Sequence, residues 1–97
     1  MSIRYSDRGS ELAPDCTWLG CSLFELPPDR TVLLQPNGEA EQWMLVRGHA
    51  LATGNGAARR LDAPEALQLP PGTTLQLQMS GPAILLLYHP VNGRASA

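Results

Sequence analysis

An all-β domain, a jelly roll or small barrel in outline, is the fold class that this sequence predicts, with about eight short antiparallel strands. Nine proline and nine glycine residues are spread over 97 positions, so a helical period is broken within about ten residues everywhere. The intervening segments are short, apolar or alternating, and recur about every 8–12 residues. With 43% hydrophobic and 16% charged residues, the chain is expected to form a single globular domain over residues 1–97.

The expected elements follow from the residues that separate them. Residues 1–15 are polar and without a sustained period, so we expect an irregular arm, and the polar tail at 90–97 is expected to fray. Turn signals rich in proline, glycine and asparagine divide the rest at Pro27-Pro28, Asn37-Gly38, Gly54-Asn55-Gly56, Pro70-Pro71-Gly72 and Ser80-Gly81-Pro82. The strands expected between them are 18–26, 31–35, 42–46, 49–53, 57–61, 66–69, 73–79 and 83–89.

The charge pattern and the lack of long apolar runs exclude two classes of partner. The net charge is −2, and all seven basic residues are arginines scattered along the chain, with only Arg59 and Arg60 adjacent. Nucleic-acid binding needs a basic stripe, which this pattern lacks. No apolar run approaches the length of about 18 residues that spans a membrane, and residues 1–8 lack an apolar signal core. We therefore expect a cytoplasmic protein with no nucleic-acid or membrane partner.

The cysteines and histidines are expected to be structural. Cys16 and Cys21 are five positions apart, and reduced thiols are the rule in the cytosol. A zinc site would need two more ligands, and His49 and His89 are not spaced to supply them. A Ser-His-Asp triad stays open, because its members are usually distant in sequence.

Two segments resemble the motifs of the cupin superfamily. The stretch from Glu41 to Gly48 keeps the glutamate and the final glycine of the first cupin motif, with six residues between them. Pro70 and Gly72 match the Pro-x-Gly of the second motif. The resemblance covers residues 18–89 and implies a small single-domain cupin-like barrel.

Cupin barrels commonly hold a metal on three histidines and a glutamate, and this chain lacks those histidines. Counting back from Glu41 with a three-residue gap places Gln35 and Asn37 at the first two histidine positions, and Leu75 falls at the third. Amide oxygens are weak ligands for transition metals, and leucine has no donor atom. We expect no bound metal and no cofactor.

The same resemblance predicts which residues line the barrel. If Glu41 points inward, strand alternation puts Trp43 and Leu45 on its face. The expected pocket residues are Leu33, Gln35, Asn37, Glu41, Trp43, Leu45, Leu75, Leu77 and Met79. The lumen is then either an apolar pocket with a polar rim or a core filled by its own side chains.

Two functions of different class are compatible with this pattern. The first is a metal-free module that binds a small apolar ligand or a protein partner, without catalysis. The second is a metal-independent isomerase, lyase or cyclase that uses Glu41 as an acid or base in the pocket. An open pocket around Glu41 favours the enzyme, and a filled lumen favours the module.

A homodimer is also expected. In this register Val32, Leu34, Met44 and Val46 point away from the lumen, and residues 83–88 are apolar on both faces. Symmetric pairing is the usual way to cover such a face. The alternative cover is the arm around Ile3, Tyr5 and Leu12, folded over the same face.

Overall fold

The chain forms two antiparallel sheets. The computed structural model describes residues 3–6, 11–36, 38–54 and 56–88, and within them there are ten strands and no helix. The strands are β1 (Ile3–Tyr5), β2 (Cys16–Trp18), β3 (Cys21–Leu26), β4 (Thr31–Leu34), β5 (Glu41–Arg47), β6 (His49–Gly54), β7 (Ala57–Asp62), β8 (Glu65–Leu69), β9 (Leu75–Met79) and β10 (Ala83–Tyr88). The all-β jelly-roll prediction is confirmed. In this part of the chain no helix has the length and hydropathy needed to cross a membrane.

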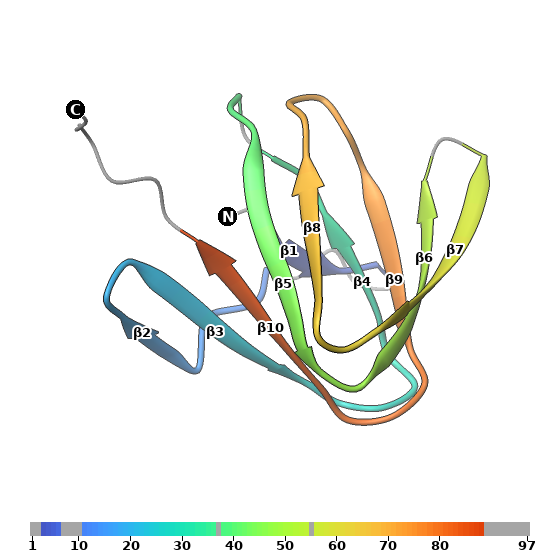
Figure 1. The fold of residues 1–97 in the computed structure, drawn as a ribbon, viewed down its shortest axis with the longest axis horizontal. Coiled ribbons are helices and arrows are strands. Elements are labelled where there is room, and N and C mark those ends of the chain that lie inside the picture. The colour runs from blue at the N-terminus through green and yellow to red at the C-terminus, as the bar shows by residue number, and fades with distance from the viewer. Residues whose placement is uncertain (1–2, 7–10, 37, 55, 89–97) are drawn as a thin grey trace.

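The two sheets face each other as an open barrel. The first sheet has the strand order β1-β4-β9-β6-β7, and the second has β2-β3-β10-β5-β8. Figure 1 shows the connections β3–β4, β5–β6, β7–β8 and β9–β10 gathered at one end of the molecule, where the chain crosses between sheets. Edge strand β7 of the first sheet and edge strand β8 of the second follow each other in sequence, yet they belong to different sheets.

Aromatic and aliphatic side chains from both sheets fill the space between them. The rings of Phe24 and Trp43, both from the second sheet, lie 5.7 Å apart between centroids and are tilted by 39°. The largest side chains with less than 2% exposure are Trp43, Phe24, Ile3, Leu34, Leu45, Leu61, Leu77, Leu85 and Val32. Such close packing of large side chains is the main source of stability in a domain of this size.

The N-terminal part is more regular than expected. Ile3–Tyr5 forms β1, which pairs with β4, and Ile3 and Leu12 are both buried. The expectation of an irregular arm over 1–15 is wrong for this segment, because its few apolar side chains complete the core. For the same reason the arm belongs to the first sheet and does not fold over the outside of the second.

Residues 16–26 form a hairpin, where a single strand over 18–26 is expected. The chain reverses at Leu19 and Gly20, whose φ angles are 49° and 78°. Two successive positive φ values are the geometry of a tight two-residue hairpin turn, in which asparagine or glycine usually takes the first position. A leucine at this position carries no turn signal, so the sequence does not predict β2.

The register of β4 differs from the expected one by one residue. Val32 and Leu34 are fully buried, whereas Leu33 is half-buried and lies on the other face. The expectations that Leu33 faces the lumen and that Val32 and Leu34 face outward are therefore wrong. The run from Thr31 to Leu34 is apolar on both faces, and a slip of one residue exchanges them all.

Gly48 explains one part of the cupin-like pattern. It is the only residue between β5 and β6, and its φ is 97°. A Cβ at this position would lie 2.7 Å from the carbonyl oxygen of Pro82, in the turn between β9 and β10. Glycine is needed there for its backbone angle and for the close approach of a neighbouring turn.

We therefore expect Gly48→Ala to lower the free energy of unfolding by about 2–5 kcal/mol, the sum of positive-φ strain and overpacking. Gly38→Ala is the matched control, because Gly38 has a φ of 90° and a Cβ there meets no described atom within 4 Å. It should cost about 1–2 kcal/mol from strain alone. Denaturant melts measure both, and equal losses would refute the contact with Pro82.

Candidate functional site

Glu41 and Trp43 occupy the position where the cupin-like pattern predicted chemistry. They lie two residues apart on β5, so both side chains are on its inner face. The indole Nε1 of Trp43 donates a hydrogen bond to Oε1 of Glu41 at 3.1 Å. Trp43 is fully buried, and Glu41 is half-buried above it. The carboxylate therefore satisfies the one polar atom of a buried ring.

The inner faces of β5 and β9 agree with the sequence prediction. Leu45, Leu77 and Met79 are buried beside Trp43. Leu75 is half-buried at the upper end of β9, opposite Leu34 on β4. Trp43, Leu45, Leu77 and Met79 form a packed core, so the alternative of a filled lumen describes this region, and Leu75 lies at its open end.

The other predicted pocket residues are not brought together. Gln35 lies outside the core, where its Nε2 donates to Oγ1 of Thr74 at 3.2 Å. Asn37 lies outside the described residues, as does His89. Leu33 is on the outer face of the first sheet, as the register of β4 requires.

The residues present do not fit the metal of a cupin barrel. With a four-residue gap before Glu41, the first two histidine positions fall on Leu34 and Pro36, which are both buried. Leu34 pairs directly with Leu75, the third position. Three of the four ligand positions thus carry apolar side chains, which offer no donor to a cation. Over the described ranges, no three His, Cys, Asp or Glu side chains are grouped closely enough to hold a metal ion.

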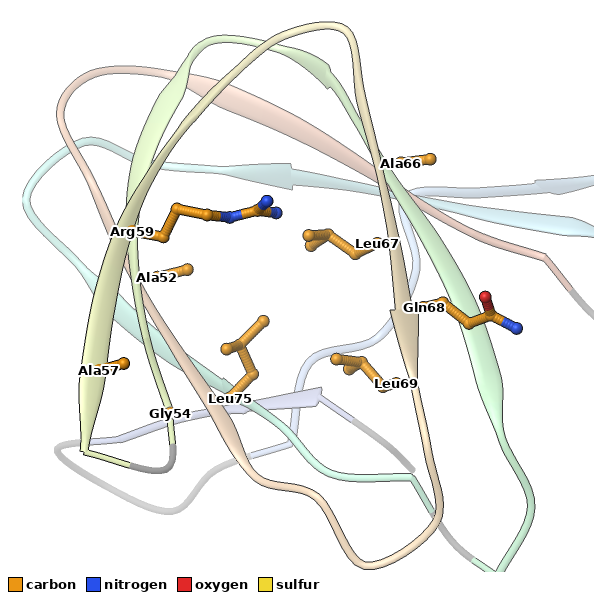
Figure 2. A pocket seen from close by; sticks show the side chains of 9 residues that line it. All are labelled: Ala52, Gly54, Ala57, Arg59, Ala66, Leu67, Gln68, Leu69 and Leu75. Carbon is orange, nitrogen blue, oxygen red and sulfur yellow. The ribbon is translucent and has the colours of Figure 1, made fainter.

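Hollows open at the mouth of the lumen and on the outer surface of the molecule. One, of about 430 Å³, is on the outer face of the second sheet and is lined by Cys16, Trp18, Leu19, Cys21, Leu23, Leu86 and Tyr88. A second, of about 270 Å³, opens between β7 and β8; we call it the mouth slot. In Figure 2 the side chains of Arg59, Leu67, Leu69 and Leu75 converge on this slot, whereas Ala66 and Gln68 point away from it.

One polar cluster was not predicted from sequence. His49 and Asp62 are paired across β6 and β7, with Nδ1 of His49 2.7 Å from Oδ1 of Asp62, and Nε of Arg60 donates to the same oxygen at 3.2 Å. The hydrogen bond from His49 is the main cause that lowers the pKa of Asp62. The three side chains are exposed and separated by up to 13 positions in sequence, so only the hairpin register reveals them.

Solved structures share this arrangement. A cupin protein from Bacteroides fragilis matches with a TM-score of 0.62 and 20% identity, over 79% of this chain and 69% of that one. A de novo designed double-stranded β-helix matches with a TM-score of 0.57 and 15% identity, over 70% of this chain and 95% of the design. The chain has the cupin fold.

A predicted oxalate decarboxylase from Thermotoga maritima has the same cupin fold, with a TM-score of 0.60 and 20% identity over 69% of this chain. The match spans 61% of that protein's length, so this chain corresponds to only part of it. No protein-family model and no curated protein sequence matches the chain. The cupin fold is therefore established by structure, and the activity of any relative is not transferred with it.

Because Trp43 is completely buried against Phe24, we expect Trp43→Ala to lower the free energy of unfolding by about 3–5 kcal/mol. Trp18→Ala is the control, since Trp18 is 71% exposed and should change stability by less than about 0.5 kcal/mol. Denaturant melts at low protein concentration compare the two. A loss under about 1 kcal/mol for Trp43→Ala would show that the lumen is not a packed core.

Proposed function

We propose that this chain is a metal-free, non-catalytic docking module with the cupin fold, and that the outer face of its second sheet pairs with a second copy of the chain. The observation that carries this proposal is a row of apolar side chains across the whole of that sheet. The strand registers place these residues side by side, one from each strand, in the order Cys16, Leu23, Leu86, Met44 and Ala66. We call this set the apolar row.

The surroundings of the apolar row resemble a protein interface. On one side the next residues across the sheet run from Trp18 through Cys21 and Tyr88 to Gln42, so the row has a partly polar border. On the other side Ile84 lies between Glu25 and Arg47. An apolar centre with aromatic residues and a polar rim is typical of protein–protein contacts.

The tip of the β2–β3 hairpin adds to this face. Leu19 is 79% exposed and adopts a positive φ, which is unfavourable for a leucine in an isolated turn. Beside it Trp18 is 71% exposed, and both line the apolar hollow. A large apolar side chain held in a strained and exposed position is expected where contact with a partner offsets its cost.

A second copy fits this face better than segments of the same chain. The N-terminal arm is used by the first sheet, since Ile3 and Leu12 are buried there. Residues 89–97 contain a single large aliphatic residue, Val91, so this segment offers little apolar surface to the row. The apolar row carries no charge, so it is complementary to a copy of itself about a two-fold axis.

The size of the face is sufficient for pairing. Five strands about 4.8 Å apart, with six residues of about 3.3 Å each, give a surface on the order of 500 Å². Two such surfaces bury on the order of 1,000 Å², the lower limit for a specific interface. We therefore propose a dimer of moderate affinity.

The filled lumen supports the docking module over the enzyme alternative. A general acid or base must reach a substrate. Neither the apolar hollow nor the mouth slot is lined by Glu41, which instead accepts the hydrogen bond from Trp43. A cytoplasmic location is part of this proposal, because Cys16 and Cys21 are free thiols and Cys16 is exposed.

Sedimentation at micromolar concentration should give twice the chain mass of 10.5 kDa for the unaltered protein. Leu86→Glu should give the monomer mass, because it places a charge at the centre of the apolar row. Leu51→Glu is the matched control, since Leu51 is exposed on the outer face of the first sheet. It should leave the dimer intact, and circular dichroism should show that both variants keep the fold.

A monomer mass for the unaltered protein at all concentrations would exclude the second copy as occupant of this face. Dissociation by Leu51→Glu with no effect of Leu86→Glu would move the interface to the first sheet.

A further inference from the structure

The mouth slot combines an apolar wall with a single cation. The second sheet contributes Leu67 and Leu69 of β8, and the first sheet contributes Leu75 of β9 and the small residues Ala52 and Ala57 of β6 and β7. Small side chains opposite large ones leave an apolar groove between the two edge strands. In Figure 2 the side chain of Arg59 reaches across this groove from β7.

Arg59 interrupts an otherwise apolar inner face. Ala57, Arg59 and Leu61 alternate on the inner side of β7, and Leu61 is fully buried in the core. Nη2 of Arg59 lies 3.0 Å from Oε2 of Glu65 on β8, and the Arg59 side chain is 65% exposed. This ion pair holds the guanidinium at the mouth and uses one of its five N–H donors. The remaining donors are available to a second acceptor.

We propose that the mouth slot binds a small carboxylate with an apolar body, whose carboxylate contacts Arg59 and whose body lies against Leu67, Leu69 and Leu75. Guanidinium pairs with carboxylates through two parallel N–H donors, which fixes the orientation of the ligand. The apolar wall provides burial for the rest of the molecule. This inference is independent of the proposed dimer, because Leu67 and Leu69 face the slot from the inner side of β8, whereas Ala66 of the apolar row points away from it.

The volume of the slot limits the size of the ligand. A cavity of about 150 Å³ is enough to hold benzene. The slot measures about 270 Å³ and is open to solvent, so a chain of about six carbons or a single aromatic ring with a short acidic arm fits. A ligand of that size is expected to bind with a Kd on the order of 1 mM.

Titration with hexanoate, followed by methyl and arginine Nε NMR signals, tests the proposal. We expect saturable shifts of Leu67, Leu69, Leu75 and Arg59, and weaker binding of hexan-1-ol, which has the same body without the charge. Arg59→Gln should weaken hexanoate binding about five- to tenfold and leave hexan-1-ol unchanged. Glu65→Gln should strengthen hexanoate binding, because it removes the competing carboxylate.

Arg60→Gln is the matched control, because it makes the same change of charge on the same strand, at a residue that pairs with Asp62. It should not alter hexanoate binding. Equal effects of Arg59→Gln and Arg60→Gln would show that Arg59 acts only through its net charge, and would contradict a direct contact between Arg59 and the ligand carboxylate. Shifts confined to the apolar hollow around Trp18, or no saturable binding, would overturn the proposal. In those cases Arg59 serves only as an inward charge that blocks pairing at a sheet edge.

Discussion

The burial of Trp43 is the constraint on which the rest of this structure depends. Its indole occupies the centre of the barrel, packs against Phe24 at 5.7 Å and donates its N–H to Glu41. The interior of a small barrel is just wide enough to be filled by side chains or to hold one small ligand. Once the ring is in place, the positions that could hold a metal become packing positions, and Leu34 and Leu75 meet where imidazoles would otherwise converge. Glu41 matches the glutamate of the cupin motif, but in this structure it accepts a hydrogen bond from the buried Trp43 ring.

Filling the lumen moves the accessible apolar surface to other parts of the molecule. A domain of 97 residues cannot bury all of its apolar side chains in one core, and the second sheet has apolar residues on both faces of β10. The inner set completes the core, and the outer set forms the middle of the apolar row. The open edge between β7 and β8 is the second consequence, because a barrel that does not close leaves a groove between its last strands. On the outer face of the second sheet and in the groove between β7 and β8, the exposed apolar surface consists of side chains that the filled core could not take in.

Much of the fold could be predicted from the sequence, because turn residues and alternation are local signals. The strands predicted at 42–46, 49–53, 57–61, 66–69 and 83–89 correspond to β5, β6, β7, β8 and β10, and the predicted inward faces of β5 and β9 agree with the structure. The sequence does not predict which face of β4 is buried, because Val32, Leu33 and Leu34 are all apolar. The hairpin at Leu19 has a leucine where a turn signal needs asparagine or glycine, and the strand at Ile3 depends on pairing with β4, far along the chain. The mouth slot and the pair of His49 with Asp62 likewise exist only through the register of edge strands.

The account is tested most directly by hydrogen exchange of the two tryptophan indole N–H groups. Trp18 is 71% exposed and provides an internal reference within the same molecule, whereas Trp43 is fully buried. If the lumen is a packed core, the Trp43 indole proton exchanges only when the whole domain unfolds, with the same free energy as global denaturation. At a protein concentration low enough to keep the chain monomeric, the Trp18 proton should exchange at once. Exchange of Trp43 at a rate close to that of Trp18 under native conditions would contradict the account, because it would require a lumen open to water.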